Sequence, residues 1–424
     1  MMLKQKTEFK QTEIGLIPED WEVKKLGDIA KFQYGLGESA EESGEFVYIR
    51  ITDITQEGFL MKNGMAYLNK NKVPEDYVLT RGDVLVARTG ATYGKTYLFR
   101  DNFRATFGGF LIRLLFDKKV IDNDFFFQFT RSYLYWNQAN NLVTGGAQPQ
   151  FNANVISEIL TPLPPLTEQK RIASILSQID DKIELNRKMN KTLEAIGQAL
   201  FKHWFVDFEF PNERGEPYKS SGGEMVDSEL GKMPKGWKVG KISDEFNLTM
   251  GQSPPGDSYN EISEGVAFFQ GRTDFGFRYP TKRIFCTEPA KFASPGDTLV
   301  SVRAPVGDIN MANEKCCIGR GVAAIRHKTS SRSYSYYSMK NLRDSFSHFE
   351  AEGTVFGSIG KTDFEKIKII VPSETLIKLF EKITYCLDQR IETNCLIIEM
   401  LSQTRDSLLP KLISGKIRVP IGVD

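Results

Sequence analysis

Two long stretches of the chain carry apolar residues at a seven-residue spacing. The first, residues 163–205, starts with Pro164 and Pro165, which exclude a helix before them, and Thr167 is suited to the N-cap. Its stripe has one line of Ile172, Ile179, Asn186, Leu193 and Leu200, and a second line of Leu176, Ile183, Asn190, Gly197 and Trp204. The second stretch has Phe380, Leu387, Asn394, Leu401 and Leu408 beside Thr384, Ile391, Ile398, Arg405 and Leu412. This pattern predicts two long helices that pair as a coiled coil.

Each stripe has an asparagine in the middle of the same line, Asn186 in the first and Asn394 in the second. A polar residue in an apolar seam costs stability but penalises slipped registers. We therefore expect these two side chains to lie near one another and to fix the register of the coiled coil. The alternative is that each asparagine is solvated at a loose crossing.

The helices belong to two copies of a repeated unit. Residues 13–35 and 229–251 align without a gap, and eight of 23 positions are identical. Further along, residues 81–90 pair with residues 296–305, since each stretch is a Gly-Asp turn followed by an apolar strand and an arginine. The chain is therefore a tandem repeat of one globular domain followed by one helix.

The repeat predicts an α+β fold, with two similar globular α/β domains at opposite ends of a long antiparallel two-helix coiled coil and a pseudo-twofold axis between the copies. About 37 helical residues at 1.5 Å each give a rod of roughly 55 Å. That length is somewhat over one and a half turns of B-DNA, at about 34 Å per turn. The expected boundaries are a globular domain at 1–162, a helical spacer at 163–210, a linker at 211–228, a second globular domain at 229–371 and a second helical spacer at 372–424.

Composition and charge narrow the class of protein. With 41% hydrophobic and 12% aromatic residues, the 424-residue chain has ample material for packed cores. Its net charge of +1 argues against a ligand held by bulk charge alone, although a balanced total can hide a basic face. The five cysteines form no regular framework, and neither a signal segment nor an apolar run of membrane-spanning length is present. We expect a cytoplasmic protein with no membrane partner.

The motifs of common enzyme sites are absent from the sequence. The stretch RTGATYGKTYLF at 88–99 resembles a phosphate-binding loop, but Gly90 and Gly94 enclose three residues where that loop needs four. Its counterpart in the second copy, residues 303–307, has no lysine after the last glycine, so we predict a strand and turn instead. The three histidines are far from the cysteines, and there is no nucleophile elbow and no adenine-methyltransferase motif. We expect a non-catalytic chain that binds no metal and no cofactor.

The segment PPLTEQKRIA at 164–173, followed by a heptad helix, resembles the signature of specificity subunits of type I restriction–modification enzymes. The tandem order of domain and helix is similar to that family too. So are the regions around Trp21 and Trp237, the Gly-Asp strand entries, and the segments at 268–277 and 301–308. The resemblance covers essentially the whole chain, and the ordered set of motifs is specific although no single motif is decisive.

The resemblance implies a subunit that reads DNA and is not itself catalytic. Each globular part would be a target recognition domain for one half of a bipartite target, and the paired helices would act as a spacer and a platform. The implied partners are double-stranded DNA, two modification (methyltransferase) subunits and restriction subunits, and S-adenosylmethionine, ATP and Mg would be bound by those partner subunits. The signature implies docking through Pro164, Pro165, Glu168, Gln169 and Pro372. The second copy has Pro372 but lacks the second proline and the Glu-Gln pair, so its docking surface is expected to differ.

The candidate DNA-binding residues combine charge or amide groups with positions near aromatics, glycines or strand ends. Basic residues among aromatics suit a rigid surface that meets phosphates, and glycine-rich turns let the backbone approach a ligand closely. The basic set is Lys95, Arg100, Arg104, Arg272, Arg278, Lys282 and Arg283. The turn set is Gln148, Gln150, Asn152, Ser358 and Lys361. Arg88 and Arg303 follow the Gly-Asp strands and are expected to contact phosphates.

Other interpretations of these residues are open at this point. The basic and aromatic stretches also fit half-buried strands, the turns fit purely structural loops, and Arg88 and Arg303 fit salt bridges within a domain. Because the two copies differ in nearly all these loops, reading of bases by both predicts an asymmetric target. At the level of function, one alternative is a coiled-coil adaptor that binds protein. Another is the specificity subunit of a related restriction system whose partner fuses modification and cleavage.

Overall fold

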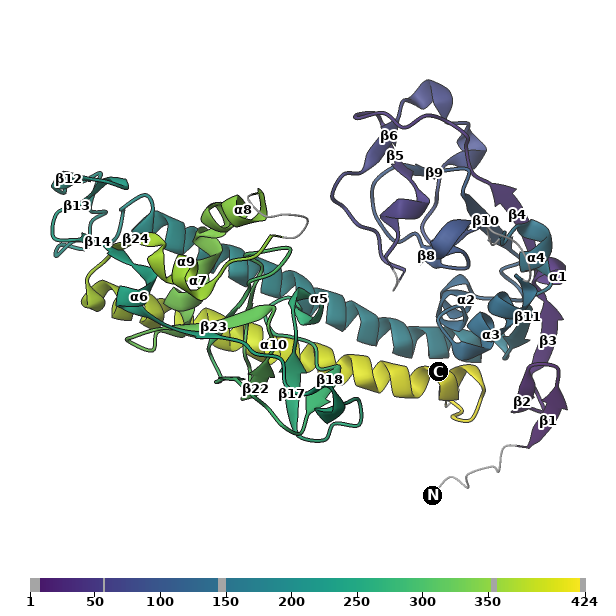
Figure 1. Cartoon of the computed structure of the whole chain (residues 1–424). Helices are drawn as coiled ribbons and strands as arrows, with labels where there is room; N and C mark the ends of the chain where they lie inside the picture. The colour runs from purple at the N-terminus through teal and green to yellow at the C-terminus, as the bar shows by residue number, and fades with distance from the viewer. Residues whose placement is uncertain (1–7, 56–57, 144–149, 352–356, 420–424) are drawn as a thin grey trace, which may run out of the picture. The chain divides into compact units, whose positions relative to one another are not determined.

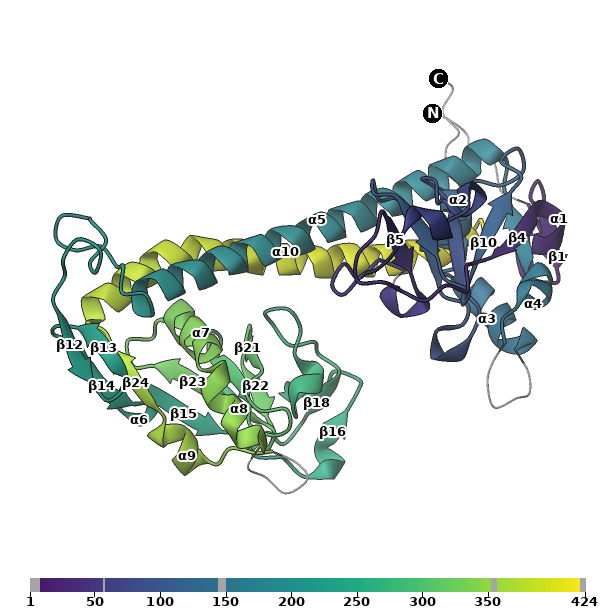
Figure 2. The ribbon, with the colours of Figure 1, turned by 90° about the horizontal axis from the view of Figure 1, so that it is seen from above.

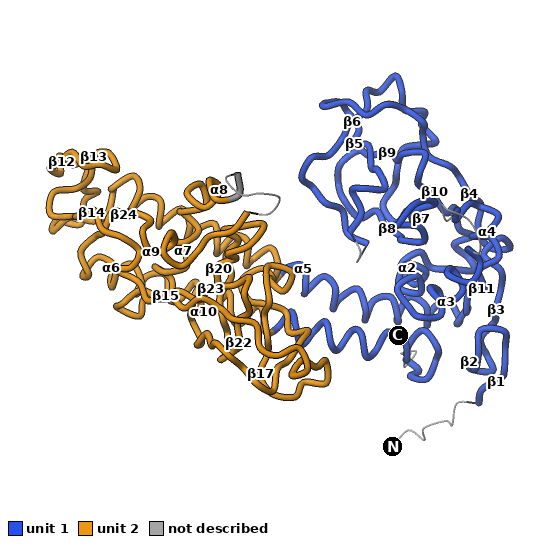
Figure 3. The backbone as a smooth tube through the Cα atoms, viewed as in Figure 1, with its two compact units in different colours: residues 1–185, 397–424 blue, residues 186–396 orange. Residues whose placement is uncertain are grey.

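The structure, a computed structural model, describes residues 8–55, 58–143, 150–351 and 357–419. The chain forms two compact units, unit 1 (residues 1–185 with 397–424) and unit 2 (residues 186–396), coloured separately in Figure 3. Helices α5 (Leu166–Phe205) and α10 (Glu374–Ile413) have 40 residues each and contribute to both units. The predicted helices are thus present, and α5 begins directly after the two prolines.

Unit 1 contains a four-stranded sheet in the order β4-β10-β7-β8, a three-stranded sheet in the order β6-β5-β9, and the strand pairs β1-β2 and β11-β3 (Figure 1). Before α5 its elements are β1 (Phe9–Thr12), β2 (Gly15–Pro18), β3 (Glu22–Lys25), α1 (Leu26–Ile29), β4 (Ala30–Tyr34), β5 (Phe46–Ile49), β6 (Ala66–Leu68), β7 (Val84–Ala87), β8 (Thr96–Leu98), β9 (Ala105–Phe107), β10 (Leu111–Phe116), α2 (Asn123–Phe129), α3 (Tyr133–Leu142), α4 (Ala153–Ser157) and β11 (Leu160–Leu163). Short 3₁₀ turns lie at Ile51–Asp53, Lys70–Lys72, Glu75–Tyr77 and Gly90–Thr92. The last turn occupies the predicted strand-and-turn stretch.

Unit 2 repeats the four-stranded sheet and the two strand pairs, but its second sheet has five strands where that of unit 1 has three. Its sheets are β15-β23-β20-β21 and β16-β18-β17-β22-β19, with the strand pairs β12-β13 and β14-β24. Its elements are β12 (Met225–Ser228), β13 (Gly231–Pro234), β14 (Lys238–Lys241), α6 (Ile242–Glu245), β15 (Phe246–Met250), β16 (Tyr259–Asn260), β17 (Val266–Phe269), β18 (Ile284–Cys286), β19 (Phe292–Ala293), β20 (Thr298–Ser301), β21 (Ile309–Met311), β22 (Cys316–Ile318), β23 (Val322–His327), α7 (Arg332–Asn341), α8 (Arg343–Ala351), α9 (Lys361–Lys366) and β24 (Lys368–Val371), with 3₁₀ turns at Gly256–Ser258 and Arg272–Asp274.

Strand register confirms the repeat in detail. In unit 1, Leu111 of β10 faces Ala87 of β7, and in unit 2 Val322 of β23 faces Ser301 of β20. Strand β5 runs parallel to β9, just as β17 runs parallel to β22. Both Gly-Asp turns therefore lead into the predicted buried strands, and the paired residues of β7 and β10 have counterparts in β20 and β23.

In unit 1, the start of α5 packs against the end of α10. Ile172 and Leu176 share a buried core with Leu412, Ile413 and the aromatic residues of α2. One turn further along α5, the buried Asp180 accepts a hydrogen bond from Arg405 of α10 (3.2 Å). Because α5 positions rise as α10 positions fall, the two segments are antiparallel in this unit.

The same arrangement holds in unit 2, where α7 lies between the sheet of β23 and the paired helices (Figure 2). Phe201 of α5 contacts Phe380 of α10, with ring centroids 5.8 Å apart, and both rings pack on Tyr334 and Tyr337 of α7. Since Asn190, which precedes Phe201 on α5, pairs with Asn394, which follows Phe380 on α10, this pairing is antiparallel as well. The apolar residues of the heptad stripe therefore largely contact the recognition domain, in addition to forming the helix–helix seam.

Trp21 and Trp237, which match between the two copies, connect the ends of the long helices to the globular domains. In unit 1 the indole N–H of Trp21 donates to Glu168 (3.2 Å), whose charge is balanced by Arg418 (2.8 Å). In unit 2, Trp237 instead packs on Phe205, Phe208 and Phe210. The equivalent tryptophans are thus held by different interactions, a hydrogen bond to a carboxylate in unit 1 and contacts with aromatic rings in unit 2.

This placement revises the expectation for the docking residues. Glu168 and Gln169 are fully buried, and Gln169 is hydrogen-bonded to the backbone of Val120, Asp122 and Pro164. Pro164 and Pro372 are buried too, whereas Pro165 is exposed. The Glu-Gln pair therefore holds the helix start to the recognition domain, and burial excludes it from direct contact with a partner subunit.

The second copy has Leu376 and Ile377 where the first has Glu168 and Gln169, and both of these apolar residues are buried as well. Two apolar residues thus replace the Glu-Gln pair at the same buried position. The replacement does not indicate that a docking surface has been lost.

Candidate nucleic-acid interface

In unit 2, five backbone segments converge where the strands of both sheets end. The N–H of Gln252 donates to Ile318 (3.0 Å), and the N–H of Gly321 donates to Gln270 (3.1 Å). The N–H of Val302 donates to Gly321 (3.0 Å), and Arg303 forms an isolated β-bridge with Ser358. The exposed side chains of these segments form the unit 2 loop surface, which consists of Gln252, Gln270, Arg303, Arg320 and Ser358.

Unit 1 has a corresponding set of segments. The N–H of Gly109 donates to Leu36 (2.7 Å), and the N–H of Arg88 donates to Phe110 (3.0 Å). Thr89 forms an isolated β-bridge with Gln150, which matches the bridge between Arg303 and Ser358. The exposed and half-buried side chains here form the unit 1 loop surface, which consists of Tyr34, Arg88, Thr89, Phe110 and Gln150.

Glycines allow the unit 2 segments to approach one another. A Cβ atom on Gly251 would lie 2.2 Å from the carbonyl oxygen of Gly319, and one on Gly321 would lie 2.5 Å from that of Gln270. Any larger residue would separate these backbones, because such distances are far below van der Waals contact. The turns are therefore held rigidly, and their remaining side chains project from a fixed platform.

The unit 1 loop surface is partly aromatic. The guanidinium of Arg88 donates to the carbonyl of Gly109 (2.8 Å) and lies 5.3 Å from the ring centroid of Tyr34 and 5.7 Å from that of Phe110. Phe110 is 57% exposed, more than any other phenylalanine among the described residues. An arginine between two aromatic rings is suited to contact the backbone and the base edges or faces of a nucleic acid.

A buried tyrosine stabilises this edge of unit 1. The hydroxyl of Tyr48, on β5, donates to the carbonyl of Leu36 (2.6 Å), and burial raises the pKa of Tyr48. The hydroxyl consequently stays protonated and remains a donor over the physiological pH range. This bond fixes the segment that also accepts the N–H of Gly109.

Arg88 and Arg303, which the sequence suggested as counterparts, are offset by one residue. Strand register makes Val302 the equivalent of Arg88, and Thr89 the equivalent of Arg303. Successive strand residues point to opposite faces, so the two arginines leave their strands in different directions. Arg303 is exposed, and no carboxylate among the described residues forms an ion pair with it.

The other candidates in unit 1 are divided among different environments. Gln150 is exposed on the loop surface, whereas Asn152 caps α4 by accepting the N–H of Val155 (3.1 Å). Arg104 lies at the start of β9, at the other end of that strand from the loop surface, above the ring of Phe46 (4.3 Å). Gln148 lies outside the described residues.

Two further basic candidates in unit 1 are turned toward the helices. Arg100 pairs with Asp124 and donates to Ser177 of α5 (2.9 Å). Lys95 lines an open cavity of about 200 Å³ together with Arg131 and Arg405. The placement of these residues does not support a position on the loop surface.

In unit 2 the exposed basic candidates are largely paired with carboxylates. Arg272 pairs with Asp308 (2.9 Å), next to the loop surface. Lys282 pairs with Glu314 (2.7 Å) and Arg283 with Asp274 (2.5 Å). The fourth pair joins Lys361 to Glu365 within α9 (3.5 Å), while Ser358 lies on the loop surface.

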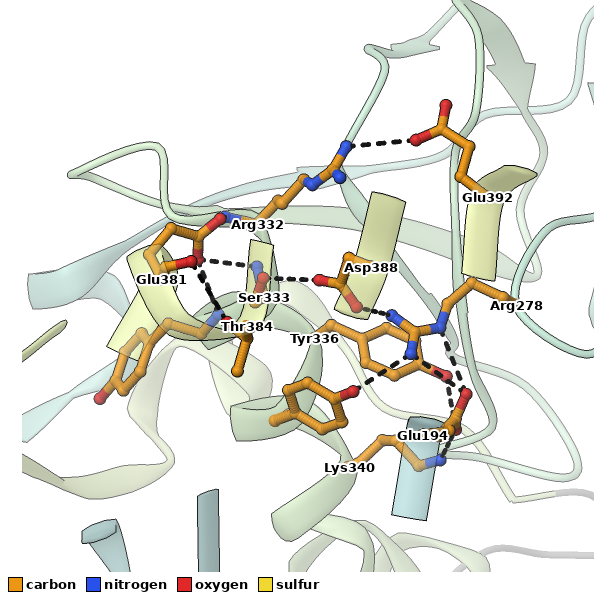
Figure 4. A network of polar contacts seen from close by, with 12 residues as sticks. Glu194, Arg278, Arg332, Ser333, Tyr336, Lys340, Glu381, Thr384, Asp388 and Glu392 are labelled. Carbon is orange, nitrogen blue, oxygen red and sulfur yellow. Dashed lines mark hydrogen bonds and ion pairs between the residues drawn. The ribbon is translucent and has the colours of Figure 1, made fainter. Parts of the chain in front are cut away.

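The prediction that Arg278 binds DNA is wrong, because its side chain is buried. Its side chain is 0% exposed, donates to Asp388 (2.9 Å) and Glu194 (3.2 Å), and lies 4.0 Å from the ring centroid of Tyr336 (Figure 4). Lys340 of α7 also pairs with Glu194. Arg278 thus fastens a loop of the recognition domain to both long helices, and burial leaves it no access to a duplex.

A comparable polar anchor exists in unit 1. Asp180 receives Arg131 of the recognition domain (2.5 Å) in addition to Arg405 of α10. Asp388 lies as far beyond Pro372 as Asp180 lies beyond Pro164, so the two buried aspartates are repeat-equivalent. In each unit, a repeat-equivalent buried aspartate on a long helix therefore binds an arginine of the recognition domain. The position of that arginine in the domain differs between the two units.

Sequence reasoning missed six residues of the two loop surfaces: Gln252, Gln270, Arg320, Tyr34, Thr89 and Phe110. Arg320 lies between Gly319 and Gly321 at the turn from β22 to β23, and Tyr34 and Phe110 flank Arg88. An arginine between two glycines at a strand-to-strand turn was a usable signal for Arg320. Phe110 gave no such signal, because an apolar residue beside a strand is read as core.

Among the described residues, no group of three or more histidine, cysteine or acidic side chains could hold a metal ion. No helix in the described parts of the chain is both long and apolar enough to cross a bilayer.

The sequence model of a protein family, the type I restriction modification DNA specificity domain, matches the chain twice, at residues 18–195 and 234–391. A putative type I restriction enzyme MjaX specificity subunit from Methanocaldococcus jannaschii is 31% identical over 430 residues, which cover 97% of each chain. The HindI specificity subunit from Haemophilus influenzae is 25% identical over 64% of this chain and 72% of its own. The crystal structure of a type I S subunit from M. genitalium has the same fold, with a TM-score of 0.59 at 18% identity over 92% of this chain and 96% of that one.

Two tandem copies of a mixed α/β domain, each followed by a long helix and each with a loop surface, define a DNA-recognition class of protein. The chain belongs to the type I restriction–modification DNA specificity family. Proteins of this family recognise DNA sequence as one subunit of a larger enzyme and are not themselves catalytic.

Proposed function

We propose that the chain recognises a bipartite, asymmetric DNA target and directs methylation, and cleavage where a cleaving partner is present, by associated subunits. The observation that carries this proposal is the pair of loop surfaces, which are built on equivalent backbone positions but present different side chains. Unit 1 presents Tyr34, Phe110 and Gln150, whereas unit 2 presents Arg303 and Arg320. Two loop surfaces that share a backbone scaffold but differ in their side chains are suited to recognise two different half-sites.

Among the candidates, those on the loop surfaces are retained as direct DNA contacts: Arg88, Gln150, Arg303 and Ser358. Arg272 lies beside the unit 2 loop surface and is retained as well. Lys282, Arg283 and Lys361 are exposed but paired, so each would have to exchange a carboxylate for a phosphate. The continuous helices α5 and α10 are proposed as the spacer that sets the distance between half-sites, at about 60 Å for 40 residues each.

The proposed partners are double-stranded DNA, two modification subunits and restriction subunits. S-adenosylmethionine, ATP and Mg belong to the partners in this proposal, and this chain supplies recognition alone. The helices within unit 2 carry exposed apolar side chains, and contact with a partner protein would remove this apolar area from water. The exposed side chains are Ile196, Leu379, Ile383, Tyr385 and Leu396.

The proposal is tested by expressing the chain with the modification subunit from the same genome in a host without adenine methylation and sequencing the methylated bases. We expect one motif in two parts, separated by a fixed unspecified spacer, with different bases in the two halves. Omission of this chain should abolish the motif. Methylation at an undivided or palindromic motif would contradict bipartite asymmetric reading, and an absence of methylation with an assembled complex would favour the adaptor alternative.

A further inference from the structure

Arg320 differs from most of the basic candidates of unit 2, because it is exposed and its charge is not balanced by a carboxylate among the described residues. Arg272, Lys282 and Arg283 all form ion pairs. An exposed cation without a partner in a nearly neutral protein has more to gain from an anionic or acceptor-rich ligand than a paired one.

A hydrogen bond to a neighbouring segment fixes the orientation of the Arg320 side chain. Its Nε–H donates to the hydroxyl oxygen of Ser253 (3.2 Å), which lies on the segment that follows β15. The glycines on either side allow close contact with the backbone of Gln270, since a Cβ on Gly319 would lie 3.1 Å from its Cα and one on Gly321 would lie 2.5 Å from its carbonyl oxygen. With Nε held by Ser253, the Nη1 and Nη2 groups form a fork that makes no hydrogen bond to any residue within the described ranges.

Such a fork matches one base edge best. Guanine presents two acceptors, N7 and O6, to the major groove, and a bidentate arginine is the commonest specific contact to it. A phosphate contact needs only charge and is tolerant of orientation, whereas a base contact needs a side chain that is positioned in advance. The neighbouring amides of Gln252 and Gln270 are suited to hydrogen-bond adjacent base edges on the same surface.

We propose that Arg320 is a specificity-determining residue that reads one guanine in the half-site recognised by unit 2, and that Ser253 positions it. This inference rests on the proposed function. It predicts that this half-site contains a guanine whose replacement weakens binding, and that the effect disappears when the arginine fork is removed.

The test uses the complete chain in complex with its modification subunits. Once sequencing has given the methylated motif, duplexes that differ by one base pair at a time are titrated with the wild type and with Arg320→Ala. The wild type should discriminate against replacement of one guanine by roughly 5- to 150-fold. Arg320→Ala should lose this discrimination at that base pair and retain it at the others, and sequencing should show the motif relaxed at one position.

Three further variants separate base reading from charge. Arg320→Lys keeps the charge but not the fork, so it should lose most of the guanine discrimination while binding more tightly than Arg320→Ala. Ser253→Ala should reduce discrimination at the same base pair and nowhere else. Arg214→Ala removes an exposed arginine in a turn at 212–216 of unit 2 and should change nothing.

Uniform weakening of all duplexes by Arg320→Ala would overturn the proposal, because it indicates a phosphate contact. Unchanged discrimination, or a motif whose halves both lack guanine, would overturn it as well. These results would leave bipartite recognition intact. An absence of any methylated motif from the assembled wild-type complex would instead contradict the proposed function.

Discussion

Asn394 donates a hydrogen bond from Nδ2 to Oδ1 of Asn190, 2.9 Å away, where α10 and α5 pack in unit 2. Both side chains are buried, and Asn190 also donates to Sγ of Cys395 (3.4 Å). The sequence pointed to a buried asparagine in each helix, but it singled out Asn186, which is one turn before Asn190 on α5. The direct partner of Asn394 is therefore the asparagine of the neighbouring heptad line.

This pair should behave as one unit in mutants. Asn394→Leu leaves the carbonyl oxygen of Asn190 buried without its donor and should lower the free energy of unfolding by about 1–3 kcal/mol. The double variant Asn190→Leu/Asn394→Leu should be less destabilised than the sum of the two single variants, because it removes both polar groups together. Chemical denaturation of all four proteins gives the coupling. Additive losses would contradict a direct interaction.

Arg278 should be far more important for stability than for DNA affinity. Arg278→Met leaves Asp388 as a buried carboxylate without its cation, whereas Glu194 keeps its pair with Lys340, and removing one partner of a buried pair costs about 3–5 kcal/mol in comparable cases. The matched control is Lys282→Met, whose pair with Glu314 is 40% exposed on each side and should be worth about 0–1 kcal/mol. Denaturant unfolding measures both. Equal effects of the two substitutions would show that the buried anchor is not formed.

His327 should make unit 2 sensitive to mild acid. Burial lowers the pKa of His327 from its ordinary value of 6.5, and its Nδ1 accepts the N–H of Thr329 (3.2 Å). The unfolded chain therefore takes up a proton before the folded one does, so stability is present above the unfolded pKa and is lost as the pH falls below it.

The measurement compares the free energies of unfolding of the wild type and His327→Gln at about pH 7.5 and about pH 5.5. The wild type should lose more stability on acidification than the variant, because only the wild type carries the buried imidazole. An equal loss in the two proteins would mean that the imidazole is readily protonated in the folded state.

The elements with strong local patterns could be predicted from the sequence. Heptad spacing gave both long helices, and the repeated Gly-Asp turns gave β7 and β20, because periodicity and turn chemistry are local properties. The interpretation of Arg278 did not hold, since alternating arginine and aromatic residues fit a buried cation among tyrosines as well as a basic surface. That choice depends on Glu194 and Asp388, which are distant in the sequence.

The loop surfaces were only partly predictable for a similar reason. Gln150 and Ser358 were found because glycine-rich turns precede the helices in both copies. Arg320 and Phe110 were missed, since their exposure follows from how three or more strand ends meet. The offset of Arg88 and Arg303 is one residue, which is enough to reverse the direction of a strand side chain.

Photo-crosslinking shows whether equivalent surfaces of the two units read different halves of one duplex. A photoreactive benzoylphenylalanine replaces Gln150, its counterpart Ser358, or Ile262, which is 76% exposed at the other end of β17 from the loop surface. Each complex is irradiated on a duplex that contains the methylated motif, and the labelled bases are mapped. The Gln150 variant should label one half, the Ser358 variant should label the other half, and the Ile262 variant should label neither. Labelling of the same half by both, or no labelling above the Ile262 control, would contradict it.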